Sequence, residues 1–178
     1  HDAKLHDDLA LLLTTSGSTG SPKLVKLTKE NIKSNAESIS EYLKIGCDDR
    51  AITSLPFNYS YGLSVINSHL FSGGSIILSN SSMMEDKFWK SINDHSATSI
   101  AGVPYNYEMM LRLGIDNLNI QTVNKMTQAG GKLNYLKAKK VNDSLRLKGI
   151  DFYTMYGQTE ATARISYLPC GNIDKKPN

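Results

Sequence analysis

The ten residues TTSGSTGSPK, at positions 14–23, decide how this sequence is interpreted. Eight of the ten are Gly, Ser or Thr, and they follow the apolar run LALLL at positions 9–13. Such a stretch has little side-chain bulk, several hydroxyls and backbone N–H groups that are free to converge on an anion. We therefore expect a phosphate-binding loop placed directly after a buried strand.

Two common phosphate motifs do not fit this stretch. A Walker A loop requires G-x-x-x-x-G-K-[ST], whereas here Pro22 precedes Lys23 and Leu24 follows it. The dinucleotide fingerprint G-x-G-x-x-G is also absent. The structural alternative is a flexible Ser/Gly linker, although a linker does not usually end in Pro-Lys and continue into an apolar segment.

Composition limits the class of protein. The chain has 178 residues, of which 40% are hydrophobic and 21% charged, as expected for one soluble globular domain. Its formal charge of +3 comes from scattered Lys and Arg, without a basic stripe or an aromatic RNA-binding signature, so no nucleic-acid partner is expected.

Cysteine use and hydropathy indicate the compartment. Cys47 and Cys170 are far apart and form no CxxC pair, which argues against zinc and against a disulfide framework. No apolar run is long enough to span a bilayer, and the amino end is polar, unlike a signal peptide. We expect a cytoplasmic protein with reduced thiols and no membrane span.

Strand-like and helix-like segments alternate along the chain. Strands are expected at residues 9–14, 24–27, 51–55, 75–79, 99–103, 125–128 and 151–155, and helices at 29–45, 61–71, 84–95, 104–113 and 133–142. Thr28 is the expected N-cap of the first helix. The alternation predicts an α/β fold, a Rossmann-like three-layer α/β/α arrangement with a largely parallel sheet, as a single domain over residues 1–178.

Ligands of such sheets bind beyond the carboxyl ends of the strands. Three loops of small and polar residues follow expected strands: TTSGSTGSPK, QAGGK at 128–132 and YGQTEAT at 156–162. Each could be an ordinary turn. Their joint placement at strand ends favours a single ligand site.

The string TSGSTGSPK resembles the phosphate-binding loop of the adenylate-forming superfamily, which includes acyl-CoA synthetases, luciferases and the adenylation domains of peptide synthetases. The usual pattern there is [ST]-[SG]-G-[ST]-T-G-x-P-K-G, and this sequence departs from it at Leu24. MYGQTEAT resembles the superfamily's Y-G-x-T-E motif, and QAGGK its Gly-Gly segment. The resemblance extends over residues 9–168 and implies a subdomain of the acyl-CoA synthetase-like fold.

The resemblance also implies roles for individual residues. Tyr156 is expected to stack on adenine, Thr159 to bond the α-phosphate, and Glu160 to ligate Mg²⁺, while Lys23, Thr159 and Glu160 are the expected catalytic residues. The expected ATP- and AMP-binding residues are Thr15, Ser16, Gly17, Ser18, Thr19, Gly20, Lys23, Gly130, Gly131, Lys132, Tyr156, Gly157, Gln158 and Thr159.

LPFNYSYGLSV, at 55–65, resembles the family segment P-x-F-H-x-x-G at the acyl pocket. The expected acyl-pocket residues are Phe57, Tyr59, Gly62, Val103 and Ala129. Tyr59 stands where relatives commonly have His, and a Tyr does not titrate near neutral pH. The four histidines, His1, His6, His69 and His95, are interpreted as surface or helix residues without supporting partners.

The implied reaction is ATP-dependent activation of a small-molecule carboxylic acid to an acyl-adenylate. ATP and Mg²⁺ are the expected cofactors, and coenzyme A or a carrier-protein pantetheine is the expected class of acceptor. Family members are several times longer, so we expect residues 1–178 to be an excised, inactive part of the large amino-terminal domain, without the carboxyl-terminal domain. The alternative is a nucleotide- or acyl-binding module, or a degenerate relative, without catalysis. The departures at Leu24 and Tyr59 favour this alternative, and the retention of Lys23, Thr159 and Glu160 together argues against it.

Overall fold

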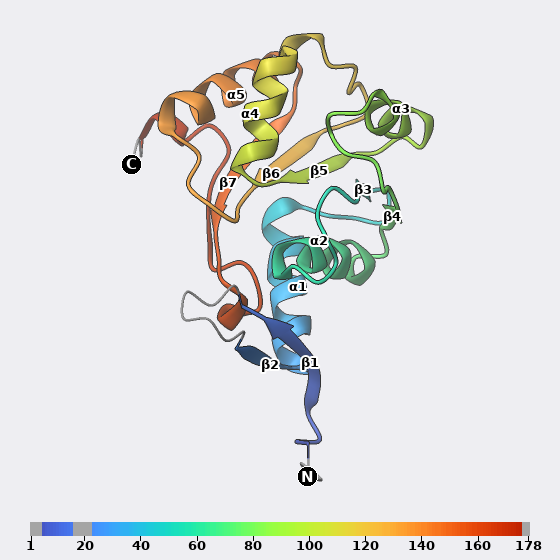
Figure 1. The fold of residues 1–178 in the computed structure, drawn as a ribbon, viewed down its shortest axis with the longest axis vertical. Coiled ribbons are helices and arrows are strands. Elements are labelled where there is room, and N and C mark those ends of the chain that lie inside the picture. Colours follow the sequence, from blue (N-terminus) through green and yellow to red (C-terminus); the bar gives the residue numbers. More distant parts are fainter. Residues whose placement is uncertain (1–4, 16–22, 176–178) are drawn as a thin grey trace.

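The computed structural model has three layers, with one sheet between two groups of helices (Figure 1). It describes residues 5–15 and 23–175. The strands are β1 (Leu9–Thr14), β2 (Leu24–Thr28), β3 (Arg50–Ile52), β4 (Ser75–Ile77), β5 (Ser99–Gly102), β6 (Lys125–Gln128), β7 (Asp151–Tyr156) and β8 (Ser166–Leu168). The helices are α1 (Lys29–Leu43), α2 (Ser60–Phe71), α3 (Asp86–Asp94), α4 (Pro104–Leu113) and α5 (Tyr135–Leu147), with single 3₁₀ turns η1 (Ile115–Asn117), η2 (Thr159–Ala161) and η3 (Ile173–Lys175).

The main sheet has six strands in the order β4-β3-β5-β6-β7-β8. Five of them run parallel, and β8 pairs antiparallel with β7. The carboxyl ends of β3, β5, β6 and β7 therefore meet at one edge, which we call the carboxyl edge. Their amino ends meet at the opposite, amino edge.

Two apolar clusters cover the two faces of this sheet. One joins the sheet to α1 and α2, and the other joins it to α3, α4 and α5 (Figure 1). Successive strand residues alternate between the clusters, so that Ala51 and Ala101 face α1 and α2 while Ile52 and Ile100 face the other helices. The predicted three-layer α/β/α fold with a largely parallel sheet is confirmed.

Helix α1 begins at the expected residue. The Thr28 hydroxyl accepts a hydrogen bond from the Asn31 N–H at 3.1 Å, and the Asn31 side-chain oxygen accepts from the Thr28 N–H at 3.1 Å. This capping box satisfies two donors that the helix itself leaves free. The helix ends at Leu43, and its C-cap residue Lys44 has the left-handed backbone conformation with φ of 52°.

The prediction that the first strand belongs to the parallel sheet is wrong. Strands β1 and β2 form a separate two-stranded antiparallel sheet beside α1 (Figure 1). Of the six residues of β1 only Leu13 is buried, so this strand is not the buried strand that its composition suggested. The first loop thus joins two antiparallel strands, and only the other two loops lie at the carboxyl edge.

Smaller differences concern element ends. Helix α5 continues past residue 142 to Leu147, and β3 ends at Ile52 rather than at residue 55. Strand β8 and the 3₁₀ turns were not expected from the sequence. Within residues 5–15 and 23–175, no helix combines the length and apolar character needed to cross a membrane.

Candidate active site

The Gly-Gly loop after β6 lies at the carboxyl edge and is fixed by its own side chains. The buried Gln128 amide donates a hydrogen bond to the Gly131 carbonyl at 2.8 Å. Gly130 has φ of 77°, which a residue with a Cβ rarely adopts. The sequence contained the Gly-Gly signal but gave no indication that Gln128 holds the turn.

Tyr59, Val103 and Gly130 converge at this edge. A Cβ added to Gly130 would overlap the Tyr59 hydroxyl and lie 3.1 Å from Val103 Cγ1. Ala129 is buried in the same cluster against which Tyr59 packs. Four of the expected acyl-pocket and nucleotide residues are therefore neighbours.

The remaining acyl-pocket residues lie differently. The Phe57 side chain is 52% exposed. Gly62 lies in the first turn of α2, where a Cβ would overlap the Pro56 carbonyl, so close backbone packing alone requires glycine there. Burial raises the pKa of Tyr59 above its usual value, and this phenol is therefore neutral at physiological pH.

The loop after β7 carries the second group of expected residues. Tyr156 ends the strand and is 61% exposed. Thr159 begins η2, and its hydroxyl lies 3.2 Å from the Ser60 hydroxyl in the first turn of α2. Glu160 follows and is exposed. Ser60 was missed from the sequence, because nothing in its local pattern points to a partner 99 residues away.

Two open grooves flank this loop. One, of about 410 Å³, is lined by Lys132, Tyr156 and residues of β8, so Tyr156 shares a cavity with the residue that follows the two glycines. The other, of about 350 Å³, lies between Glu160, Lys26 of β2 and polar residues of α1. Tyr156 and Glu160 thus line different grooves on the two sides of one loop.

The first loop is described only at its ends. Ser16, Gly17, Ser18, Thr19 and Gly20 lie outside the described residues. The Thr15 N–H donates to the Lys23 carbonyl at 3.0 Å, which closes the base of the loop, and the Lys23 side chain is exposed. Leu27 of β2 lines the same groove as Glu160. The β1–β2 hairpin therefore lies beside the loop that carries Thr159 and Glu160.

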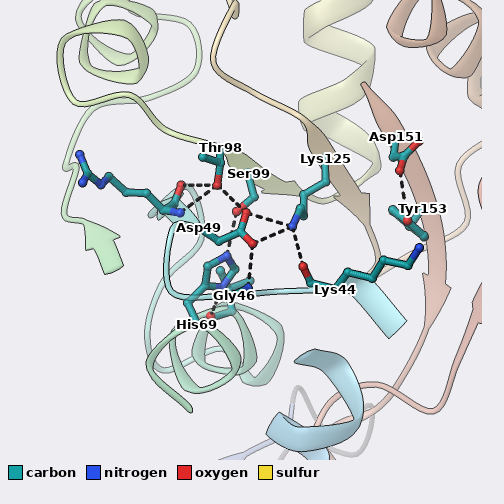
Figure 2. Close-up of polar contacts among 11 residues, drawn as sticks. Lys44, Gly46, Asp49, His69, Thr98, Ser99, Lys125, Asp151 and Tyr153 are labelled. Atoms are coloured by element: carbon teal, nitrogen blue, oxygen red, sulfur yellow. Dashed lines mark hydrogen bonds and ion pairs between the residues drawn. The ribbon is translucent and has the colours of Figure 1, made fainter. Parts of the chain in front are cut away.

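Away from the candidate site, a cluster of polar side chains lies at the amino edge of the sheet (Figure 2). Lys125 Nζ is 2.9 Å from the Asp49 carboxylate, and each side chain is 11% exposed. The carboxylate also accepts from the Thr98 hydroxyl and from the Gly46 N–H, both at 2.9 Å. Burial alone raises the pKa of Asp49, but these donors and the Lys125 charge outweigh it and lower the pKa below its usual value.

The interpretation of His69 as a residue without partners is wrong. Its Nδ1 lies 2.8 Å from the Val65 carbonyl and its Nε2 lies 2.9 Å from the Ser99 hydroxyl (Figure 2). Since a carbonyl only accepts, Nδ1 carries the proton and Nε2 accepts from Ser99. Burial lowers the pKa of His69, and both side chains are inaccessible, so this Ser-His pair is structural rather than catalytic.

The donor set at the carboxyl edge suits magnesium better than zinc. Among the described residues, no three His, Cys, Asp or Glu side chains gather to form a metal cage. Mg²⁺ is commonly held by one or two carboxylates together with phosphate oxygens and water. The exposed carboxylate of Glu160, beside strand β2 of the hairpin, is compatible with that pattern.

The sequence profile described as AMP-binding enzyme matches residues 1–178. The chain belongs to this family. It is 28% identical over 169 residues to an acyl-CoA synthetase (FUM10) of Gibberella moniliformis, covering 94% of this chain and 30% of that protein. It is also 28% identical over 157 residues to equisetin synthetase of Fusarium heterosporum, covering 86% of this chain and 4% of that protein.

Solved structures of the AMP-binding family share the fold. The o-succinylbenzoate CoA synthetase MenE of Bacillus subtilis, in complex with ATP and a magnesium ion, superposes with a TM-score of 0.79 at 28% identity, covering 93% of this chain and 33% of that one. The same enzyme is also known with the acyl-adenylate intermediate OSB-AMP. This chain thus spans about a third of the length of MenE and of the acyl-CoA synthetase.

Proposed function

We propose that this chain carries the nucleotide-binding part of an enzyme that activates a carboxylic acid with ATP. The acid's carboxylate oxygen attacks the α-phosphorus of ATP. The bond between the α-phosphorus and the oxygen that bridges it to the β-phosphorus breaks. Pyrophosphate departs, and the other product is the acyl-adenylate. The observation that carries the proposal is the meeting of the Gly-Gly loop, Tyr156 and Thr159 at one sheet edge. Membership of the AMP-binding family and likeness to MenE support it.

The nucleotide is assigned to three segments. Tyr156 stacks on adenine beside Lys132, since both residues line one groove, and the backbone of Gly130 and Gly131, which directly precede Lys132, is assigned to the same nucleotide. The Thr159 hydroxyl, oriented by Ser60, bonds the α-phosphate, and Gly157 and Gln158 supply adjacent backbone. The first loop, Thr15 to Gly20 with Lys23, holds the β- and γ-phosphates that leave.

Glu160 is the proposed magnesium ligand. Its carboxylate is exposed beside the β1–β2 hairpin, where it would hold the cation and so supply a hard oxygen ligand. When bound, Mg²⁺ neutralises the charge that develops on the leaving pyrophosphate. Catalysis at such a site depends on positioning and electrostatics and needs no protein nucleophile.

The acyl group is assigned to the side of the Gly-Gly loop where Tyr59, Val103 and Ala129 converge. The exposed Phe57 and Gly62, in the first turn of α2, are assigned to the same pocket. Coenzyme A or a carrier-protein pantetheine is the proposed acceptor. Because the chain spans about a third of MenE, the whole reaction belongs to the full-length enzyme, and we expect residues 1–178 alone to bind nucleotide weakly and not to turn over. The cytoplasmic location stays a prediction.

The test is acid-dependent exchange of labelled pyrophosphate into ATP by the full-length enzyme, across short, medium, long-chain, aryl and amino acids. Lys23→Ala and Glu160→Ala are expected to lower the exchange rate about 10²- to 10³-fold. Lys33→Ala and Glu37→Ala, exposed positions on α1, serve as matched charge controls and should retain the rate.

Two outcomes decide between the candidate functions. Exchange with one class of acid, lost in both variants and kept in both controls, supports adenylation and names the substrate class. ATP binding without exchange for any acid supports the binding module instead, and Leu24→Gly and Tyr59→His then become the first reversions to measure.

A further inference from the structure

Arg164 is a buried cation without a carboxylate partner. The residue is 8% exposed, and within the described part of the chain no Asp or Glu lies at ion-pair distance from it. Its Nε donates to the Ser64 hydroxyl at 3.1 Å, and its Nη1 lies 3.4 Å from the Tyr42 hydroxyl. The guanidinium carbon lies 5.0 Å from the centre of the Tyr61 ring. Buried charges in proteins are usually paired, so this arrangement requires a reason.

The contacts of Arg164 come from both helices on this face of the sheet. Ser64 and Tyr61 belong to α2 and Tyr42 belongs to α1. On α1, the Asn35 amide also donates to the Arg164 carbonyl at 3.1 Å. Arg164 therefore joins the end of one loop to two helices through both its side chain and its backbone.

That loop is the one with Thr159 and Glu160. It leaves the sheet at Tyr156 and returns at Ile165, whose N–H donates to the Tyr156 carbonyl at 2.9 Å. Within it, Gly157 packs so closely on Ala163 that a Cβ would overlap the Ala163 carbonyl. Arg164 directly precedes Ile165, whose hydrogen bond to Tyr156 closes the loop. A shift of the Arg164 side chain would therefore move the loop as well.

Helix α2 holds the loop at two points one turn apart. Ser60 contacts the Thr159 hydroxyl, and Ser64 contacts the Arg164 guanidinium. Residues four apart lie on the same face of a helix, so both contacts are made by one stripe of α2. The face of α2 that contacts Arg164 therefore also fixes the position of Thr159.

We propose that Arg164 is a positioning residue for nucleotide activation: it anchors the loop that presents Thr159 and Glu160, and it leaves an uncompensated positive charge behind the phosphates bound there. The inference rests on the proposed function. Hydroxyls and an aromatic face satisfy the guanidinium without neutralising it, which keeps its charge available to an anion. A carboxylate partner at this position would cancel that charge.

Three substitutions test the anchoring contacts and the charge of Arg164. Arg164→Met keeps the apolar stem and removes both functions, whereas Arg164→Lys keeps the charge but loses the planar fork that contacts Ser64 and Tyr42. Ser64→Ala is the milder variant, because it removes one acceptor and leaves the cation in place. Lys125→Met, at the amino edge, is the control for loss of a buried cation far from the loop.

Two measurements are made on the full-length enzyme and these variants. Pyrophosphate exchange gives kcat and the KM for ATP and for the acid. Backbone hydrogen exchange of residues 157–165 is compared with that of β5 and β6. We expect Arg164→Met to lower kcat/KM for ATP about 10²-fold, with little change in the KM for the acid. Exchange should accelerate in residues 157–165 and stay unchanged in β5 and β6, with Arg164→Lys and Ser64→Ala intermediate.

The control distinguishes positioning from stability. Lys125→Met should lower the unfolding temperature while leaving the KM for ATP and the exchange of residues 157–165 unchanged. Arg164→Met with wild-type kinetics and wild-type exchange in residues 157–165 would overturn the inference. If the wild-type enzyme activates no acid, the proposed function fails, and the hydrogen-exchange comparison still decides whether Arg164 anchors the loop.

Discussion

The Tyr59 hydroxyl occupies the space into which a Cβ on Gly130 would project. The two residues are 71 positions apart, and they meet because α2 begins and β6 ends at the same edge of the sheet. Position 130 thus needs glycine for two independent reasons, its positive φ and the phenol against it.

Replacing Gly130 should separate these two reasons. Gly130→Ala is expected to lower the free energy of unfolding by about 2–4 kcal/mol, from backbone strain and from overlap with Tyr59. Gly149→Ala is the control, because Gly149 has φ of 73° and no atom within 4 Å of an added Cβ, so only strain of about 1–2 kcal/mol applies. Urea unfolding measures both, and Tyr59→Phe should recover part of the difference. Equal losses at the two glycines would contradict the contact.

Tyr156 should contribute to nucleotide affinity without contributing to stability. Its side chain is 61% exposed, and loss of stacking on a base costs about 1–3 kcal/mol, so Tyr156→Ala should raise the Kd for ATP about 5- to 150-fold. Phe71→Ala, at a 47% exposed aromatic residue near the opposite edge, is the control. Calorimetric titration with ATP measures the Kd, and an unchanged value for Tyr156→Ala would refute the stacking role.

The Asp49–Lys125 pair should dominate the stability of the amino edge. Lys125→Met leaves the buried carboxylate without its cation and should cost about 3–5 kcal/mol of unfolding free energy. Replacing both residues with apolar ones should recover much of that loss, since the desolvation cost disappears with the charges. A double variant no more stable than Lys125→Met would contradict this account.

The same pair predicts a direction for acid sensitivity. The pKa of Asp49 is lower in the folded protein than in the unfolded chain, so its stabilising contribution is present above the unfolded pKa of 3.8. That contribution is lost as the pH falls from there through the lower folded pKa. Unfolding measured from neutral pH downward should show this loss, and Asn at position 49 should abolish it. An unchanged acid profile in Asp49→Asn would count against the pair.

Gly157 should be needed for the shape of the loop that carries Thr159 and Glu160. An added Cβ would overlap the Ala163 carbonyl, so Gly157→Ala must open the loop closure and should weaken ATP binding. Gly171→Ala provides the control, because nothing lies within 4 Å of a Cβ there although its φ is 79°. The measurement is ATP affinity at a temperature where both variants are folded. Retained affinity in Gly157→Ala would show that the loop tolerates the opening.

The sequence was sufficient to predict the parallel sheet and its helices, but not the antiparallel pairing of β1 with β2. Strands such as β5 and β6 are short, buried runs bounded by turns, and the alternation with helices specified a parallel sheet. The segment between β1 and β2 is too short for the helical crossover that parallel strands need, so the spacing of the two strands favours the antiparallel pairing that the structure has. Strand β8 has three largely exposed residues and carries no pattern.

The motif residues could be recognised from the sequence, but the residues that contact their loops could not. The Gly-Gly and Y-G-x-T-E segments are contiguous and carry composition signals of their own. Ser60, Gln128 and Arg164 contact partners that packing brings to them, and those of Ser60 and Arg164 are about 100 residues away in the sequence, so single-chain patterns do not indicate them. The buried partners of His69 were missed for the same reason.

The same strands carry a charged network at one end and the candidate site at the other. Strand β6 begins with the paired cation Lys125 and ends at the loop with Gly130, and β5 likewise runs from Ser99 to the residues near Val103. The buried ion pair and the candidate site therefore lie at opposite ends of single strands. We expect heat-resistant variants to carry substitutions at the amino edge and variants with altered acid preference to carry them at the carboxyl edge.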